Sequence, residues 1–339
     1  MTSVLSVLRA GPSMTLQDLG RPGYMGEGLS VGGAADRTAF LEGVALLGQS
    51  VECAAIEMAA FGGDFTASTD IRIALTGAPM VAACDGEILT WNASHILQAG
   101  QRLSIGAATA GVYGYLHVGG GLVTDAFLNS RSTHLTAGIG ALIETGEKYS
   151  IGEDPNRREA NKLISSAPRF EGGTVRILPS VQTRLFSTDV LERFQKTVFS
   201  RSPRANRQGL ELLFEGDPFS TKDQLTILSE PMIAGDIQMT GEGKPFVLLP
   251  ECQTTGGYPR IGTVLPADLP IVAQAGAGQR LQFQFIDYDS ALRTYRTKDR
   301  HLSELASSIC PLLRDPHDMR DLLAYQLVGG VVDAFDVPD

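Results

Sequence analysis

The chain has 339 residues, of which 43% are hydrophobic and 19% are charged, and its formal net charge is −10. This length exceeds what one hydrophobic core usually fills, so we expect two domains. The acidic balance argues against binding to nucleic acid or anionic membranes. No apolar run is long enough to span a bilayer, and the first residues lack the pattern of a signal peptide. We therefore expect a cytoplasmic location.

The first half of the chain favours short strands joined by glycine turns. Apolar residues alternate with others over residues 71–76, and a second strand over Tyr113–Val118 stops at the triple glycine 119–121. One helix is predicted between Asp36, a suitable N-cap, and Gly48, a suitable C-terminal glycine. The apolar stripe of this helix would consist of Phe40, Val44 and Leu47.

The second half repeats this character and then changes. A helix is predicted from Ser187, with an apolar side made of Leu191, Phe194 and Val198. Further strands are predicted over residues 224–228, 246–249, 269–274 and 280–286. Beyond residue 290 the charged sequence carries Leu302, Leu305 and Ile309 at helical spacing, and another helix is predicted from residue 315.

An internal echo suggests that the two halves share one architecture. The pentapeptide AGQRL occurs at residues 99–103 and again at 277–281, and the segments from residues 7 and 175 also begin alike. Between the halves, residues 154–173 mix charge, proline and glycine and lose the strand pattern, which is typical of a linker. We therefore predict an N-terminal β domain over 1–153, a linker over 154–173, a C-terminal β domain over 174–288 and a helical tail over 289–339.

Four polar stretches, at residues 15–23, 129–133, 204–209 and 252–270, are candidates for function. They combine arginines with hydroxyl and amide side chains, which suits the binding of a carboxylate or phosphate oxygen. Structural alternatives remain open for each: an Asp18–Arg21 pair, a capped turn, a solvated loop and a hairpin whose hydroxyls bond its own backbone. No phosphate-binding loop, dinucleotide fingerprint, nucleophile elbow or metal-ligand spacing of the cysteines and histidines is found, so no metal site is predicted.

The order of eight motifs carries a family resemblance. From about residue 7 to residue 286 the chain reads TLQDLGRPG, GGAAD, AIEM, GYLHVGGGL, NSRST, RANRQG, GDIQ and QTTGGYP. This order resembles the allophanate hydrolase subunit 2 family, also called the biotin-dependent carboxyltransferase family. The family includes the C subunit of 5-oxoprolinase and the carboxyltransferase part of urea carboxylase (urea amidolyase). The chain departs from the family with GGAAD, where SGAMD is more usual, and with VALLGQ at residues 44–49.

The resemblance implies a mainly β fold of two cyclophilin-like β-barrels related by internal duplication, with the helical tail outside the common core. It implies the C subunit of an ATP-dependent 5-oxoprolinase complex, which opens the lactam of 5-oxoproline to glutamate. The expected partners are a chain like subunit 1 (the B subunit) and a YcsF/LamB-like subunit. ATP would act at the level of the complex, and biotin only if another chain carries it. Two alternatives stay open: transfer of a carboxyl group from carboxybiotin to urea, and a regulatory role as binding partner of a subunit 1-like kinase inhibitor.

The motifs also designate candidate site residues. Cations for a carboxylate, a phosphate or a developing oxyanion would come from Arg21, Arg131, Arg207 and Arg260. Acid, base or orienting carboxylates would be Asp18, Asp36 and Glu57. Substrate-binding residues would be Ser132, Thr133, Asn206, Gln238, Gln253, Thr254, Thr255, Gly256, Gly257 and Tyr258. No residue is assigned as a nucleophile.

Overall fold

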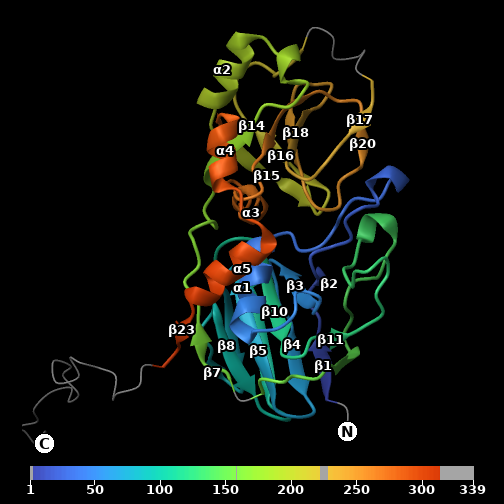
Figure 1. The fold of residues 1–339 in the computed structure, drawn as a ribbon, viewed down its shortest axis with the longest axis vertical. Coiled ribbons are helices and arrows are strands. Elements are labelled where there is room, and N and C mark those ends of the chain that lie inside the picture. Colours follow the sequence, from blue (N-terminus) through green and yellow to red (C-terminus); the bar gives the residue numbers. More distant parts are fainter. Residues whose placement is uncertain (1–2, 158, 222–227, 314–339) are drawn as a thin grey trace, which may run out of the picture.

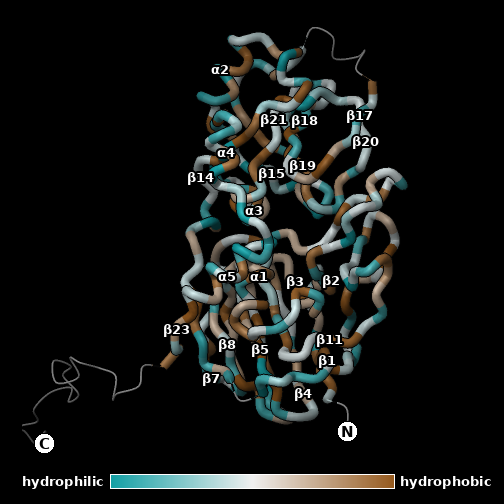
Figure 2. Tube along the Cα trace, viewed as in Figure 1, coloured by the Kyte–Doolittle hydropathy of each residue, from teal (hydrophilic) through white to brown (hydrophobic). Residues whose placement is uncertain are grey.

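The computed structural model describes residues 3–157, 159–221 and 228–313. They form two β-rich units stacked along the long axis of the molecule, the N-terminal unit below and the C-terminal unit above (Figure 1). The predicted mainly β fold is confirmed. In both units hydrophobic stretches run along the strands (Figure 2), as expected where sheets bury one face against a core. No helix in the described ranges is long and apolar enough to cross a membrane.

The N-terminal unit contains two seven-stranded antiparallel sheets. The first has the order β11 (Leu122–Val123), β12 (Lys148–Ile151), β1 (Val4–Arg9), β4 (Asp64–Ala67), β9 (Arg102–Ala108), β6 (Met80–Cys84), β7 (Glu87–Ile88). The second has the order β2 (Met14–Gln17), β3 (Ala55–Ala59), β10 (Tyr113–Val118), β5 (Ile71–Gly77), β8 (Ala93–Leu97), β13 (Lys162–Leu163), β23 (Cys310–Pro311). Every residue of β5 is buried, so this strand is not the half-exposed one that its alternation predicts. Helix α1 packs on it and explains the difference.

Helix α1 (Arg37–Leu47) forms as predicted. The Asp36 carboxylate accepts the backbone N–H of Ala39 at 2.9 Å, and Gly48 ends the helix in the left-handed region at φ 58°. The predicted stripe of Phe40, Val44 and Leu47 is buried. The cap therefore places Asp36 at the end of α1.

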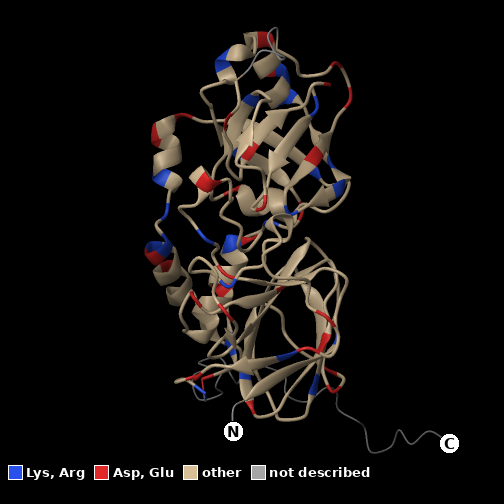
Figure 3. Ribbon diagram, turned by 90° about the vertical axis from the view of Figure 1, so that its right-hand side faces the viewer, with Lys and Arg blue, Asp and Glu red and all other residues tan. Residues whose placement is uncertain are grey.

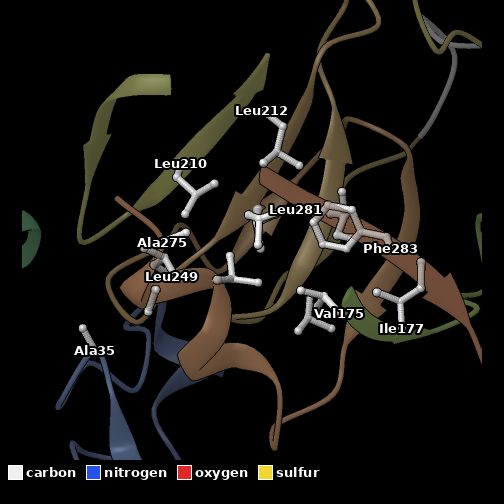
Figure 4. Packing of buried hydrophobic residues seen from close by; sticks show 14 of the residues in the cluster. Ala35, Val175, Ile177, Leu210, Leu212, Leu249, Ala275, Leu281 and Phe283 are labelled. Carbon is white, nitrogen blue, oxygen red and sulfur yellow. The ribbon is translucent and has the colours of Figure 1, made fainter. Parts of the chain in front are cut away.

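The C-terminal unit is a closed seven-stranded barrel. Its order is β14 (Gly173–Leu178), β21 (Arg260–Val264), β18 (Asp236–Met239), β19 (Pro245–Leu248), β16 (Gly209–Leu213), β15 (Phe199–Asn206), β22 (Arg280–Phe285), and a parallel β14–β22 pair closes it. A small ladder joins β17 (Glu230–Pro231) to β20 (Thr255–Gly256). Figure 4 shows Val175, Leu212, Leu281 and Phe283 converging in the barrel interior.

Two predictions in this unit need correction. Residues 269–274 form a helix, α3 (Leu269–Gln274), rather than a strand. The error has a physical reason: a short apolar run fits a buried strand or a buried helix equally well, and Pro270 in the first turn favours the helix. Helix α2 (Thr188–Lys196) is capped by Ser187 as predicted, but it ends before the half-exposed Val198. Residues 222–227 lie outside the described ranges and with them nearly all of the strand predicted over 224–228.

The segments that connect and follow the two units return to the N-terminal unit. Residues 154–173 contribute β13, and β23 pairs with it at the sheet edge. Helices α4 (Tyr288–Thr294) and α5 (Lys298–Ser307) precede β23, and α5 packs on α1 through Leu302 and Leu305. The described residues also contain three short 3-10 turns: η1 (Met25–Glu27), η2 (Leu135–Ala137) and η3 (Thr183–Leu185). The helix predicted from residue 315 lies outside the described residues.

The AGQRL echo has a structural counterpart. Both copies form a turn that leads into a strand, β9 in one unit and β22 in the other, and Gly100 and Gly278 share φ +81°. The second echo diverges, because β1 is followed by strand β2 whereas β14 is followed by η3. The structure is compatible with an internal duplication.

Candidate functional site

One hydrophobic cluster runs through both units. It includes Ala35 and Tyr115 from the N-terminal unit together with Leu249 and Ala275 from the barrel. Figure 4 shows Ala35 approaching Leu249 and Ala275 from below. Because interiors are closely packed, a shared core holds the two units in a fixed orientation. Several charged residues also lie where the two units meet (Figure 3), and their partners define the candidate site.

Arg207, from the turn between β15 and β16, reaches into the N-terminal unit. Its guanidinium donates to Glu57, to the Glu251 carboxylate at 2.5 Å and to the backbone carbonyl of Gly33. All three side chains are buried. Burial alone would lower the pKa of Arg207, but the charges of Glu57 and Glu251 raise it overall. The predicted cation Arg207 is thus fully committed to internal carboxylates.

Glu57 is the centre of a second set of bonds. Its other carboxylate oxygen accepts the N–H of Ala35 at 2.8 Å and the hydroxyl of Tyr115 at 2.7 Å. Tyr115 in turn accepts the N–H of Asp36 at 2.9 Å. Burial, followed by the charge of Glu57, raises the pKa of Tyr115 well above its usual value. These bonds tie the predicted carboxylate Glu57 to the start of α1.

Asp36 does more than cap its helix. Its second oxygen accepts from Arg169 of the connecting segment at 2.7 Å and from the Gln274 side-chain amide at 2.8 Å. Arg169 also pairs with Glu42, whose pKa is raised by burial against the opposing effect of Arg169. Gln274 further accepts the N–H of Tyr113 at 2.9 Å. This buried cluster joins α1, the connecting segment and α3.

The stretches at residues 15–23 and 129–133 meet at Asp18. Its carboxylate accepts the Ser130 hydroxyl at 2.7 Å, the Ser132 hydroxyl at 2.5 Å, the N–H of Arg131 at 2.7 Å and the N–H of Gly20 at 2.7 Å. Asp18 therefore organises the 129–133 loop instead of forming the hydrogen-bonded pair with Arg21 that the loop alternative predicts.

Arg21 and Arg131 differ in the partners of their guanidinium groups. Arg21 is buried and donates to the carbonyls of Ser132 and, at 3.4 Å, Phe127. Arg131 is half-buried, and among the described residues its guanidinium has no hydrogen-bond or ion-pair partner. Arg131 is therefore a cation that the structure leaves available.

The stretch at 252–270 starts beside the Arg207 cluster. Gln253 donates to Gln238 at 3.1 Å, Thr254 is buried, and Tyr258 is 47% exposed. Thr255 and Gly256 form β20, and Gly257 follows as a partly exposed residue. This segment therefore leaves the junction at Glu251 and presents amide, hydroxyl and aromatic groups along the side of the barrel (Figure 1).

The remaining predicted residues have local partners. Arg260 pairs with Glu230 at 2.6 Å and Asp236 at 3.1 Å, and Asn206 accepts the N–H groups of its own turn. Thr133 is buried, and its carbonyl accepts from Gln17. The predicted residues fall into separate groups around Asp18, around Glu57 and Arg207, around Asp36, and along 253–260. The structure does not bring all of them onto one ligand-sized surface.

Residues that the prediction missed lie next to the predicted stretches. Glu251 precedes Cys252, His134 follows Thr133, and Ser30 precedes the GGAAD motif. Extending each stretch by one or two residues would have included them. Arg169, Glu42 and Gln274 gave no such signal, because they are far apart in sequence and meet only in the fold.

Two other features bear on ligands. A surface hollow of about 380 Å³ lies beside α2 and is lined by none of the predicted site residues. Its lining consists of three amides, one hydroxyl, one aromatic ring and one exposed ion pair. In the described part of the chain, no group of three or more His, Cys, Asp and Glu side chains could hold a metal ion.

Comparison with known families decides the identity of this architecture. Residues 27–285, well over half of the chain, match the model of the carboxyltransferase domain, subdomain A and B. The chain belongs to this carboxyltransferase family. The resemblance drawn from the eight motifs is therefore confirmed.

Relatives of this carboxyltransferase-family chain carry two different names. The C subunit of 5-oxoprolinase from Escherichia coli (strain K12) is 30% identical over 308 residues, which cover 89% of this chain and 98% of that protein. Urea amidolyase from Saccharomyces cerevisiae is 23% identical over 332 residues, which cover 89% of this chain and 18% of that protein. The crystal structure of the K. lactis urea amidolyase is similar in fold, with a TM-score of 0.79 and 21% identity over 92% of this chain and 21% of that one.

Proposed function

We propose that this chain is the C subunit of an ATP-dependent 5-oxoprolinase complex that opens the lactam of 5-oxoproline to glutamate. The observation that carries the proposal is the match to the Escherichia coli protein, which extends over 98% of its length. The match to urea amidolyase covers only 18% of a much longer chain. The partners would be a chain like subunit 1 (the B subunit) and a YcsF/LamB-like subunit, and ATP would be hydrolysed by the complex.

The charges of the site support an anionic substrate. Arg207 and Arg260 are neutralised by their own carboxylates, whereas Arg131 has no such partner in the described residues. The substrate 5-oxoproline carries one carboxylate, and arginine binds carboxylates through two parallel hydrogen bonds. We therefore assign Arg131 to the substrate carboxylate, with Asp18 fixing its backbone. Glu57 and Arg207 would hold the two units in register.

The test is ATP-dependent glutamate release from 5-oxoproline by the co-expressed complex, with and without this chain. Arg131→Met should raise KM for 5-oxoproline about 10- to 100-fold, because a charged hydrogen bond contributes about 1.5–3 kcal/mol. Arg102→Met is the matched control, since Arg102 lies in the same unit as Arg131, is exposed and pairs with Asp64 outside the candidate stretches. Activity that persists without this chain would refute the proposal. Unchanged activity in Arg131→Met within a tight complex would favour a regulatory binding role.

A carboxyltransferase acting on urea is the second candidate, favoured by the description of the matching family model. Biotin would then be supplied by a carrier on another chain. The assay is transfer of a labelled carboxyl group from a carboxybiotinylated carrier protein to urea. Transfer that depends on this chain, with no glutamate release from 5-oxoproline, would replace the first proposal by the second.

A further inference from the structure

Ser30, His134 and Glu251 form a buried polar array that the motifs did not single out. Ser30 Oγ lies 2.8 Å from His134 Nε2, and Glu251 Oε2 lies 3.8 Å from His134 Nδ1. Their exposed fractions are 9%, 2% and 1%. The order resembles a serine–histidine–carboxylate triad, and the array joins the two units at the start of the 252–270 stretch.

The hydrogen bonds of the ring differ from those of a triad. His134 Nδ1 accepts the N–H of Ala137 at 3.2 Å, so a neutral ring carries its proton on Nε2 and donates it to Ser30 Oγ. In this tautomer His134 is no base for Ser30. Instead it fixes the hydroxyl oxygen and leaves the hydroxyl proton of Ser30 for another acceptor.

Burial is the main reason that the ring is neutral. Burial lowers the pKa of His134, the positive charges of Arg21 and Arg207 lower it further, and the charge of Glu251 opposes them. Glu251 is itself occupied by Arg207 and by the N–H and hydroxyl of Thr136. The ring therefore stays a donor to Ser30 at neutral pH.

A second unused donor lies across Gly32. Arg21 is 1% exposed, and its Nη1 has no acceptor among the described residues. A Cβ placed on Gly32 would stand 3.1 Å from His134 Cδ2 and 3.6 Å from Arg21 Nη1. Gly32, at φ +65°, thus keeps the position between the ring and the guanidinium clear of a side chain.

We propose that the Ser30 hydroxyl, oriented by His134, and Arg21 Nη1 are paired donors for a carbonyl oxygen of the substrate. This inference rests on the proposed function, since a carbonyl oxygen gains negative charge both when a lactam opens and when a carboxyl group is transferred. Ser30 is then a catalytic residue through hydrogen bonding alone, with no covalent step. His134 is a positioning residue.

The kinetic test uses the intact complex. Ser30→Ala should lower kcat about 100-fold with KM little changed, as for removal of one oxyanion donor. His134→Ala should have a similar effect, and His134→Gln, whose amide can still donate to Ser30, should restore part of the rate. Ser307→Ala, which removes an exposed hydroxyl of α5, is the matched control. Wild-type kcat in a folded Ser30→Ala complex would overturn the inference.

A second measurement separates this inference from the proposed function. Nitrogen-15 NMR of the His134 ring in the full chain should show the Nε2–H tautomer. Its signals should shift on addition of 5-oxoproline or urea, and Ser30→Ala should abolish the shift. If the complex does not turn over 5-oxoproline but urea gives this shift, the proposed reaction fails and the donor pair stands. An Nδ1–H tautomer, or no shift with either probe, would overturn the donor pair.

Discussion

Arg207→Met tests whether the buried charges at the junction hold the two units together. The substitution keeps an unbranched, flexible side chain but removes the donor shared by Glu57, Glu251 and the Gly33 carbonyl. Removing one partner of a buried ion pair costs about 3–5 kcal/mol, because the other charge is left without compensation. Two carboxylates lose their partner here, so we expect the free energy of unfolding to fall by an amount at the upper end of this range.

The assay is equilibrium urea unfolding of the wild type and three variants. Arg9→Met is the matched control, because Arg9 pairs with Asp64 while its side chain is 53% exposed, and such a pair contributes about 1 kcal/mol or less. The triple variant Arg207→Met, Glu57→Gln, Glu251→Gln should regain much of the loss, since it buries no unpaired charge. A loss in Arg207→Met no larger than in Arg9→Met would refute the view that these charges are buried and mutually dependent.

Three further predictions concern stability. Burial lowers the pKa of His117 to about 3, below an unfolded value of about 6.5. The neutral buried ring therefore stabilises the fold fully above about pH 6.5, and this stabilisation is lost as the pH falls. Between pH 7 and pH 5 the free energy of unfolding of the wild type should therefore fall by about 2 kcal/mol more than that of His117→Leu. Urea unfolding at both pH values measures this difference. Asp18→Asn should lower the free energy of unfolding by about 2–3 kcal/mol, because a neutral amide accepts the Ser130 and Ser132 hydroxyls less strongly. Amide hydrogen exchange at residues 130–132 should become faster. Exchange as slow as in the wild type would contradict the role of Asp18 in this loop. Gly33→Ala should lower Tm much more than Gly23→Ala. Both glycines have positive φ, but only at Gly33 would a Cβ stand 2.7 Å from a backbone nitrogen, that of Gly20. Equal losses of Tm would mean that the backbone strain of positive φ is the sole cause.

Local sequence signals were sufficient where a structure depends on neighbouring residues. Asp36 and Gly48 predicted both ends of α1, and Ser187 predicted the start of α2, because capping uses side chains within three residues of the backbone groups they bond. Alternation predicted β5 and β10 as strands but not that β5 is buried on both faces, which depends on the distant helix α1. The 269–274 segment shows the limit of periodicity, since six residues do not distinguish a strand from a helix.

The sequence by itself determined the mainly β class and the family, because these follow from patterns of neighbouring residues and from motif order. Tertiary structure alone decided which charges remain usable. Arg207 and Arg131 look alike in sequence, yet Arg207 is neutralised by carboxylates 150 and 44 residues away, while Arg131 has no such partner among the described residues. The array of Ser30, His134 and Glu251 likewise joins three distant segments. The physical reason is that charge pairing and burial depend on distance in space, which the order of residues along the chain does not specify.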